Sequence, residues 1–390
     1  MSWINDVRSK INIVKKYIYF NNASSGPLFI DTIEYVKKFL DMWSEEGEPW
    51  DFALDCIIET KKLFAEFIGG SKDEIAAVPG ATYGINTILS SIRYVHGCNV
   101  VVSELNFPTS IYTLHTLRRR GFIKEIRIAR SINDYVPFEE YEKLIDDKTA
   151  VVLVDYVAWI TGYRERIREI TEIAHRHGSI IITDAYQAVG VIPIDVKKEN
   201  IDVLVTGSSK WLMGIHGAGF IYINKDIINE LEPMFSGWMS IEDSVLIKRE
   251  RGEELLDKPF DIEQFKLSST ASRFEWGTWP LISFIGTKAS LHMLRKYDAP
   301  GKYNNHTSKI IEVLMNGIEE LGFRIVTPKD SYAAIISFEY KDPKKLANYL
   351  KSKNVIVSPR PGVIRLSPHF YNTIEEAEKF LEILKQYIHS

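Results

Sequence analysis

Two reactive side chains, Asp184 and Lys210, each come directly after a short run that is rich in β-branched residues. Asp184 closes the run "SIIITD" (179–184), and Lys210 follows the run "DVLVTG" (202–207). Such runs predict buried strands, and an open α/β sheet exposes its strand ends to ligands. A lysine amine can bind an aldehyde as a Schiff base, while a carboxylate can keep a pyridine nitrogen protonated so that the ring accepts electrons. The pair therefore indicates a catalytic site built around pyridoxal 5'-phosphate.

Two nearby segments could bind other parts of this cofactor. Gln187 lies three residues after Asp184, and its amide could hydrogen-bond the ring oxygen. The segment "AAVPGATYGINTILSSI" (76–92) places a glycine turn before a predicted helix. Backbone N–H groups at a helix start are unpaired and lie at the positive end of the dipole, so Ala81 and the hydroxyl of Thr82 could hold the phosphate.

Four more side chains extend the candidate site. Ser208 and Ser209 could add phosphate donors from the lysine loop, although the spacing does not say which of them reaches. Phe107, just past a predicted strand end, could stack on the pyridine ring. Arg365, in "GVIRLSPHFYNT" (362–373), offers a fork of donors that suits the carboxylate of a substrate.

Taken singly, these residues also have ordinary structural interpretations. Asp184 could cap a helix, Phe107 could be a core residue, and Arg365 could form a surface ion pair. Their combination favours the functional interpretation. A nucleotide-binding α/β protein is a further alternative, but no G-x-G-x-x-G follows the first predicted strand, which counts against it.

The elements that must position these residues alternate along the chain from about residue 70 to 225. A helical pattern at 164–178 is an example of the segments between the strands, and it ends on a glycine that suits a helix C-terminus. Alternating strands and helices predict a mostly parallel sheet that is covered on both faces. The strand-like runs are 99–103, 122–128, 150–155, 179–184, 202–207 and 219–224.

The character of the chain changes after residue 280, where the pattern predicts a smaller α+β domain. We expect a large cofactor-binding domain at 18–284, with 1–17 and 285–390 forming the small domain. The polar run 243–264 is expected to be a surface loop. The small domain should contain helices at 281–297, 308–322 and 373–388 and strands at 332–340 and 355–359.

Composition narrows the possible partners. The chain has 390 residues and a net charge of −4 with no basic run, which argues against nucleic acid as a partner. Its apolar stretches, such as 149–160, are too short and too interrupted to span a bilayer. Only Cys56 and Cys98 are present, so we expect no disulfide framework and a cytoplasmic location.

Seven segments, in order, resemble landmarks of the class V aminotransferase family, which includes cysteine desulfurases, kynureninase and isopenicillin N epimerase. This resemblance implies pyridoxal phosphate fold type I, with a large domain around a mostly parallel sheet of the seven-stranded type. The segments are "YFNNASSGPL" (19–28), "FIGGSKDEIAAVPGATYGIN" (67–86), "SELNFPTS" (103–110), "TDAYQAVG" (183–190), "GSSKW" (207–211), "RFEWGTWP" (273–280) and "RLSPHFYNT" (365–373).

The resemblance also implies roles that the residues alone do not. Asn22 would lie near the substrate, and Trp276 would lie at the cofactor. Thr278 would reach the phosphate of the other subunit's cofactor, so the active unit would be a homodimer with its sites at the subunit interface. Cysteine desulfurases need a thiol on a loop of the C-terminal domain, and because Cys56 and Cys98 lie elsewhere, we expect that the protein is not a cysteine desulfurase.

The resulting hypothesis is an enzyme that acts on an α-amino acid, a small-molecule substrate, through a Lys210 aldimine. Phe107 cannot carry protons, so Lys210 is left as the main acid–base group. Transamination demands the fewest extra groups and is preferred. Epimerisation, as in isopenicillin N epimerase, and side-chain cleavage, as in kynureninase, are the alternatives, and a non-catalytic module that binds the cofactor is a second one.

Overall fold

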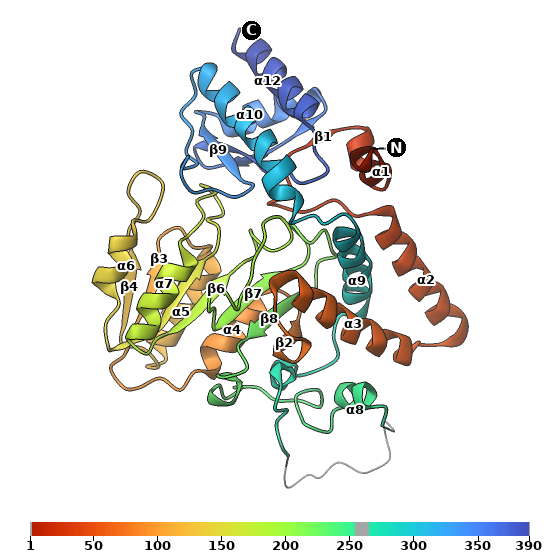
Figure 1. Ribbon diagram of the computed structural model, residues 1–390, viewed down its shortest axis with the longest axis vertical. Coiled ribbons are helices and arrows are strands. Elements are labelled where there is room, and N and C mark those ends of the chain that lie inside the picture. The colour runs from red at the N-terminus through yellow and green to blue at the C-terminus, as the bar shows by residue number, and fades with distance from the viewer. Residues whose placement is uncertain (1, 254–264, 390) are drawn as a thin grey trace.

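The computed structural model describes residues 2–253 and 265–389. Figure 1 shows a large sheet flanked by helices, with the C-terminal elements gathered at one end of the molecule. Within the described ranges the strands are β1 (Ile18–Tyr19), β2 (Ile75–Val78), β3 (Asn99–Ser103), β4 (Glu125–Ala129), β5 (Thr149–Asp155), β6 (Ile180–Asp184), β7 (Val203–Gly207), β8 (Gly219–Ile223), β9 (Ile336–Glu339), β10 (Val355–Ile356), β11 (Ser358–Arg360) and β12 (Val363–Leu366). The α-helices are α1 (Trp3–Ser9), α2 (Ile30–Glu46), α3 (Trp50–Ile68), α4 (Ala81–Ser91), α5 (Pro108–Arg119), α6 (Phe138–Leu144), α7 (Ile167–Arg176), α8 (Val245–Arg251), α9 (Leu281–Lys296), α10 (Ser308–Glu320), α11 (Pro343–Ser352) and α12 (Ile374–Ile388).

The central sheet has seven strands in the order β2-β8-β7-β6-β5-β3-β4. All neighbouring pairs are parallel except the two that involve β8. The predicted fold class, a mostly parallel sheet of seven-stranded type, is therefore confirmed. In the register of β5 and β6, Asp155 lies directly opposite Asp184, so the two carboxylates leave the sheet side by side.

Successive residues of the central strands belong to two separate cores, one on each face of the sheet. Val100 and Val102 of β3 pack in one core with Leu114 of α5, while Val101 packs in the other. In β5, Leu153 packs in the same core as Val100. A strand that is buried on both faces must be apolar at every position, which explains the continuous apolar runs in the sequence.

The C-terminal part forms a second, antiparallel sheet in the order β11-β12-β9. Residues 18–19 join this part of the chain, because β1 pairs in parallel with β10. Nη1 of Arg365, in β12, donates to the carbonyl oxygen of Trp159 over 2.6 Å, so the small sheet reaches the loop that follows β5. The predicted domain boundaries at 17/18 and 284/285 stay a prediction.

The prediction of a surface loop at 243–264 is wrong for its first part, which forms α8. The hydroxyl of Ser244 accepts a hydrogen bond from the backbone N–H of Ile247, and Gly252 ends the helix at a φ of 70°. The first turn of α8, from Val245 to Ile247, is apolar and buried. The charged residues on both sides of it led to the prediction of a loop. The remainder, 254–264, lies outside the described residues. In the described chain, no helix combines the length and apolar character needed to cross a membrane.

Candidate active site

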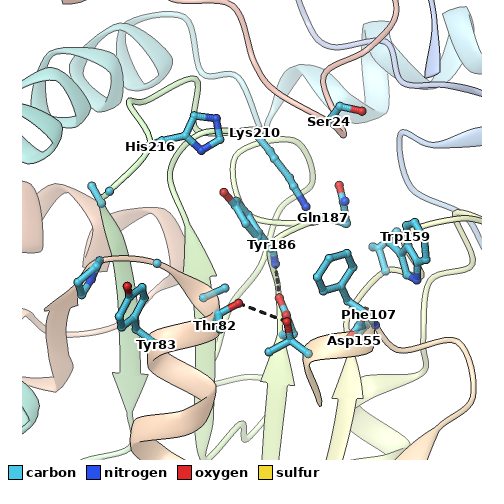
Figure 2. A pocket seen from close by; sticks show the side chains of 18 residues that line it. Ser24, Thr82, Tyr83, Phe107, Asp155, Trp159, Tyr186, Gln187, Lys210 and His216 are labelled. Carbon is cyan, nitrogen blue, oxygen red and sulfur yellow. Dashed lines mark hydrogen bonds between the residues drawn. The ribbon is translucent and has the colours of Figure 1, made fainter. Parts of the chain in front are cut away.

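A cavity of about 330 Å³ opens at the carboxyl ends of β5, β6 and β7. Figure 2 shows the side chain of Lys210 extending into it beside Tyr186 and Gln187. This position follows from the fold, because the carboxyl ends of parallel strands meet at one edge of a sheet. The cavity brings together six of the residues predicted from the sequence, namely Ala81, Thr82, Phe107, Asp184, Gln187 and Lys210.

Lys210 is half-buried and lies among aromatic rings. Its Nζ lies 4.0 Å from the ring centroid of Tyr186 and 5.7 Å from that of Phe107. Burial lowers the pKa of Lys210 from 10.5 to about 8, although the negative charge of Asp184 acts in the opposite direction. A large fraction of the amine is therefore neutral near pH 8, which is the form that attacks a carbonyl carbon.

Asp184 and Asp155 form a pair of buried carboxylates at the floor of the cavity. One oxygen of Asp184 accepts from the backbone N–H of Tyr186 over 2.9 Å, and Oδ2 of Asp155 accepts from the backbone N–H of Phe107 over 2.7 Å. Burial raises the pKa of both carboxyl groups, and the charge of Asp184 raises that of Asp155 further. Oδ1 of Asp155 is buried without a hydrogen-bond partner in the described chain.

This carboxylate pair fits the protonated nitrogen of a pyridine ring. Two buried acids that share one region favour a cation or a hydrogen-bond donor beside them. The rings of Phe107 and Tyr186 flank the same space on the side of Lys210. The two carboxylates and the two rings therefore match a flat, positively charged heterocycle that Lys210 can reach.

The other end of the cavity fits a phosphate. Ala81, Thr82 and Tyr83, the first three residues of α4, all line it, and the N–H groups of a first helical turn lack partners within the helix. The hydroxyl of Thr82 lies 3.3 Å from that of Thr109. Gly219 allows this helix start to approach the sheet, because a Cβ there would lie 2.6 Å from Cα of Gly80.

Gln187 is fixed by two hydrogen bonds. Its Nε2 donates to the carbonyl oxygen of Ala23 over 3.1 Å, and its Oε1 accepts from Nε1 of Trp211 over 2.8 Å. The bond to Trp211 also assigns the oxygen and nitrogen of the amide, because an indole nitrogen can only donate and so must face Oε1. The second N–H of Nε2 is left for a cavity ligand, as a bond to the ring oxygen requires.

Some predicted residues do not line the cavity. The hydroxyl of Ser208 donates to the carbonyl oxygen of Ile215 over 2.9 Å, and that of Ser209 shares a hydrogen bond of 2.7 Å with the hydroxyl of Tyr186. Trp276 and Thr278 line a separate hollow and are exposed in the single chain. Their roles at the cofactor stay predictions.

Asn22 and Arg365 lie just behind the cavity wall. Nδ2 of Asn22 donates to the carbonyl oxygen of Lys210 over 3.3 Å, and its Oδ1 accepts from the hydroxyl of Tyr371 over 2.6 Å. Nη2 of Arg365 donates over 2.8 Å to the hydroxyl of Ser24, which does line the cavity. Asn22 thus shapes the lysine loop, and Arg365 reaches the cavity through Ser24.

Sequence reasoning missed several lining residues, namely Ser24, Asp155, Trp159, Tyr186 and His216. Asp155 could have been found, because it closes an apolar run in the same way as Asp184. The aromatic and serine side chains follow no pattern that marks them, since their place depends on how the loops fold.

Comparison with known proteins assigns this site to a family. The family model for "Aminotransferase class-V" matches residues 18–380. The chain is 31% identical over 358 residues to "Uncharacterized aminotransferase YcbU" of Bacillus subtilis (strain 168), a match that covers 91% of this chain and 90% of that relative. The chain belongs to the class V aminotransferase family, as the resemblance predicted.

More distant relatives carry other names. A "Probable cysteine desulfurase" of Methanothermobacter thermautotrophicus is 26% identical, with 98% of this chain and 97% of the relative covered. A kynureninase of Geobacillus thermodenitrificans is also 26% identical, with 89% of this chain and 81% of the relative covered. The solved structure of a cysteine desulfurase from Thermococcus onnurineus NA1 superposes with a TM-score of 0.86 at 22% identity, and covers 99% of this chain and 98% of that one. Fold type I and the pyridoxal phosphate cofactor are thereby confirmed.

The expectation that the protein is not a cysteine desulfurase is wrong, because the comparisons do not exclude that activity. Relatives named probable cysteine desulfurase, from M. thermautotrophicus and Pyrococcus abyssi, match nearly the whole chain, and solved cysteine desulfurases share its fold. The exclusion rested on the place of a single thiol. A thiol on one loop is a local feature, so the absence of a cysteine there does not separate this chain from those relatives.

Proposed function

We propose that this protein acts on an α-amino acid, using Lys210 both to hold pyridoxal phosphate covalently and to move the Cα proton. The observation that supports this proposal is the amine of Lys210, which lines the same cavity as Asp184 and whose pKa is lowered by desolvation to about 8. When bound, the cofactor supplies an aldehyde carbon and a ring that accepts electrons from the substrate.

The chain's own residues divide the remaining work. With a substrate amine in its place at the cofactor, Nζ of Lys210 would take the Cα proton, because an amine with a pKa near 8 is a competent base near neutral pH. Asp184 favours a protonated ring nitrogen, and Asp155 keeps Phe107 in place through its backbone N–H. The first turn of α4 would hold the phosphate and so keep the reacting carbon within reach of Nζ.

Transamination is the outcome that we favour. It would need Lys210 to deliver the proton to the cofactor carbon instead of to Cα, and water to release the keto acid. The relative at 31% identity is named an aminotransferase. Cleavage of a side-chain group, including a carbon–sulfur bond, is the second candidate, because relatives are named kynureninase and cysteine desulfurase.

The assignment of Lys210 is tested by borohydride reduction of protein supplied with pyridoxal phosphate, followed by peptide mapping. The label should appear on Lys210 in the wild type and be absent from Lys210→Ala. Lys288→Ala is the matched control, since Lys288 lines a different hollow, and it should label like the wild type. Label on another lysine in the wild type would reject the assignment.

The reaction type is tested with single amino acids under anaerobic conditions. Conversion of the cofactor to its pyridoxamine form with release of a keto acid indicates transamination. Release of a side-chain fragment without that conversion supports the second candidate and rejects the first. Exchange of the Cα hydrogen with loss of optical purity, without either product, would reject both in favour of epimerisation.

We further propose a homodimeric, cytoplasmic enzyme. Trp276 and Phe235 expose 38% and 56% of their surface in the single chain, and their ring centroids lie 5.4 Å apart. Exposed aromatic clusters of this kind are frequent at subunit interfaces. Cys56 and Cys98 are both free thiols, which supports a reducing compartment.

A further inference from the structure

Two arginines, Arg360 and Arg365, converge on one serine at the edge of the cavity. Nη2 of each donates to Oγ of Ser24, over 3.1 Å from Arg360 and 2.8 Å from Arg365. Trp159 contacts both as well: its ring centroid lies 5.7 Å from Cζ of Arg360, and its carbonyl oxygen accepts from Nη1 of Arg365. Ser24 and Trp159 both line the cavity, so the two cations contact its wall from behind.

The hairpin β11–β12 forces the two cations together. Its register sets Ser358 opposite Arg365 and Arg360 opposite Val363. Arg360 and Arg365 are therefore diagonal neighbours on one face of the hairpin. Like charges that are close across a strand pair destabilise it unless something compensates them.

No acidic side chain compensates this pair in residues 2–253 and 265–389. The groups that set the pKa of either guanidinium include no carboxylate. Burial lowers the pKa of Arg365 to about 9, with a further contribution from the charge of Arg360. Nε of each arginine is buried and has no partner there. A buried cation beside a half-buried one, each with an unused donor, is costly, and an anionic ligand removes that cost.

Apart from the cofactor's phosphate, which the start of α4 would hold, the two arginines call for two negative groups. Lys210 is balanced by Asp184 and Asp155, whose charges raise its pKa, while Arg360 and Arg365 lower it. The acids and the arginines thus act on Lys210 with opposite sign. A substrate with a single carboxylate would neutralise one of the two arginines and leave the second without a counter-charge.

We propose that the substrate is an α-amino acid with a second carboxylate, whose α-carboxylate binds Arg365 and whose distal carboxylate binds Arg360. Ser24, which bonds both guanidinium groups, sets their separation and so selects the spacing of the two acids. This inference rests on the proposed function, because it takes Lys210 as the group that meets the substrate amine.

The test uses unreactive dicarboxylates, which lack an amine and therefore bind without turnover. Cofactor-loaded protein is titrated calorimetrically with glutarate and with valerate, which has the same chain length and one carboxylate. Glutarate should bind about 10- to 100-fold more tightly, as expected for one added charged hydrogen-bond pair. Succinate and butyrate form a second matched pair that tests the spacing.

Variants separate the two arginines. Arg360→Gln should reduce the preference for glutarate to within about 3-fold while leaving valerate binding nearly unchanged. Arg93→Gln is the control for the loss of one positive charge, because Arg93 is an exposed partner of Glu232 beyond the far end of α4. It should keep the wild-type preference.

Two outcomes overturn the inference without touching the proposed function. One is equal affinity of the wild type for glutarate and valerate when borohydride has already located the cofactor on Lys210. The other is an equal loss for both ligands in Arg360→Gln, which would mean that both arginines share one carboxylate. Failure to locate the cofactor on Lys210 would instead reject the proposed function itself.

Discussion

At the scale of single residues, the proposed chemistry depends on ionisable groups whose pKa values are shifted by burial. Lys210 is made less basic and Asp184 less acidic by the same cause, loss of water. A cationic ring nitrogen beside Asp184 would favour its charged form, and the aldehyde of the cofactor would react with the neutral form of Lys210. Perturbed groups that meet in one cavity mark a site better than any one of them does alone.

The first prediction concerns the pH at which Lys210 reacts. Since its pKa is lowered to about 8, its labelling by an amine reagent in cofactor-free protein should rise steeply between about pH 7 and 9, well below the range of an ordinary lysine near 10.4. Asp184 opposes this shift, so Asp184→Asn should move the rise to lower pH. A rise centred above pH 10 in the wild type, measured by mass spectrometry of the labelled peptide, would contradict the assignment.

The second prediction concerns Asp155, which acts by positioning Phe107. Asp155→Ala removes the acceptor of the Phe107 backbone N–H, and cofactor affinity should fall about 5- to 30-fold, equivalent to about 1–2 kcal/mol. Asp155→Asn keeps an acceptor oxygen and should lose less than about 3-fold. Dissociation constants from quenching of tryptophan fluorescence give the comparison, and equal losses in the two variants would show that charge, not position, is what matters.

At the scale of elements, one buried ion pair connects the segments around the proposed interface. Nζ of Lys61, in α3, lies 2.8 Å from Oε1 of Glu275, and both side chains are almost wholly buried. The same oxygen accepts from the backbone N–H of Ala77, in β2. Helix α3, strand β2 and the segment that carries Trp276 and Thr278 therefore meet at one carboxylate.

The third prediction follows from this pair. Lys61→Met leaves Glu275 buried without its cation and should lower the free energy of unfolding by about 3–5 kcal/mol. The double variant Lys61→Met, Glu275→Gln should recover most of the loss. Arg168→Met, which breaks an exposed pair with Glu172, is the control and should cost at most about 1 kcal/mol. Denaturant titration gives the values, and a cost for Lys61→Met as small as that of the control would contradict the account.

How much the sequence predicts also depends on the element. Strands β3, β5 and β6 are buried on both faces, so their apolar runs stand out and their bounds are predicted to within about one residue. Strand β2 was not predicted, because half of its short run "IAAV" is alanine, a residue that favours helices over strands. Residues at strand ends, such as Asp184, follow from the strands, whereas Trp159 and Ser24 depend on loop paths and on long-range contacts.

At the scale of the whole molecule, the site lies where distant parts of the chain meet. The segment near Ser24 pairs with the C-terminal strands, and these reach the loop after β5 through Arg365. Figure 1 shows the first and last parts of the chain beside one another at the same end of the molecule. The proposed dimer would add the exposed segment around Trp276 from a second copy.

The fourth prediction tests that dimer. In sedimentation, the wild type should show twice the 44.8 kDa mass of one chain. Trp276→Glu should weaken the association by about 10-fold or more, because it places a charge on an exposed aromatic cluster. Val95→Glu, at a site that is 76% exposed and lies before β3, should leave the dimer intact. A monomeric wild type, or equal behaviour of the two variants, would reject the proposed interface.

The most direct test of the central claim is a crystal structure of the protein grown with pyridoxal phosphate. We predict a continuous covalent bond between Nζ of Lys210 and the aldehyde carbon, with a carboxylate oxygen of Asp184 within hydrogen-bond distance of the ring nitrogen. A cofactor bound elsewhere, or a ring whose nitrogen points away from Asp184, would contradict the account.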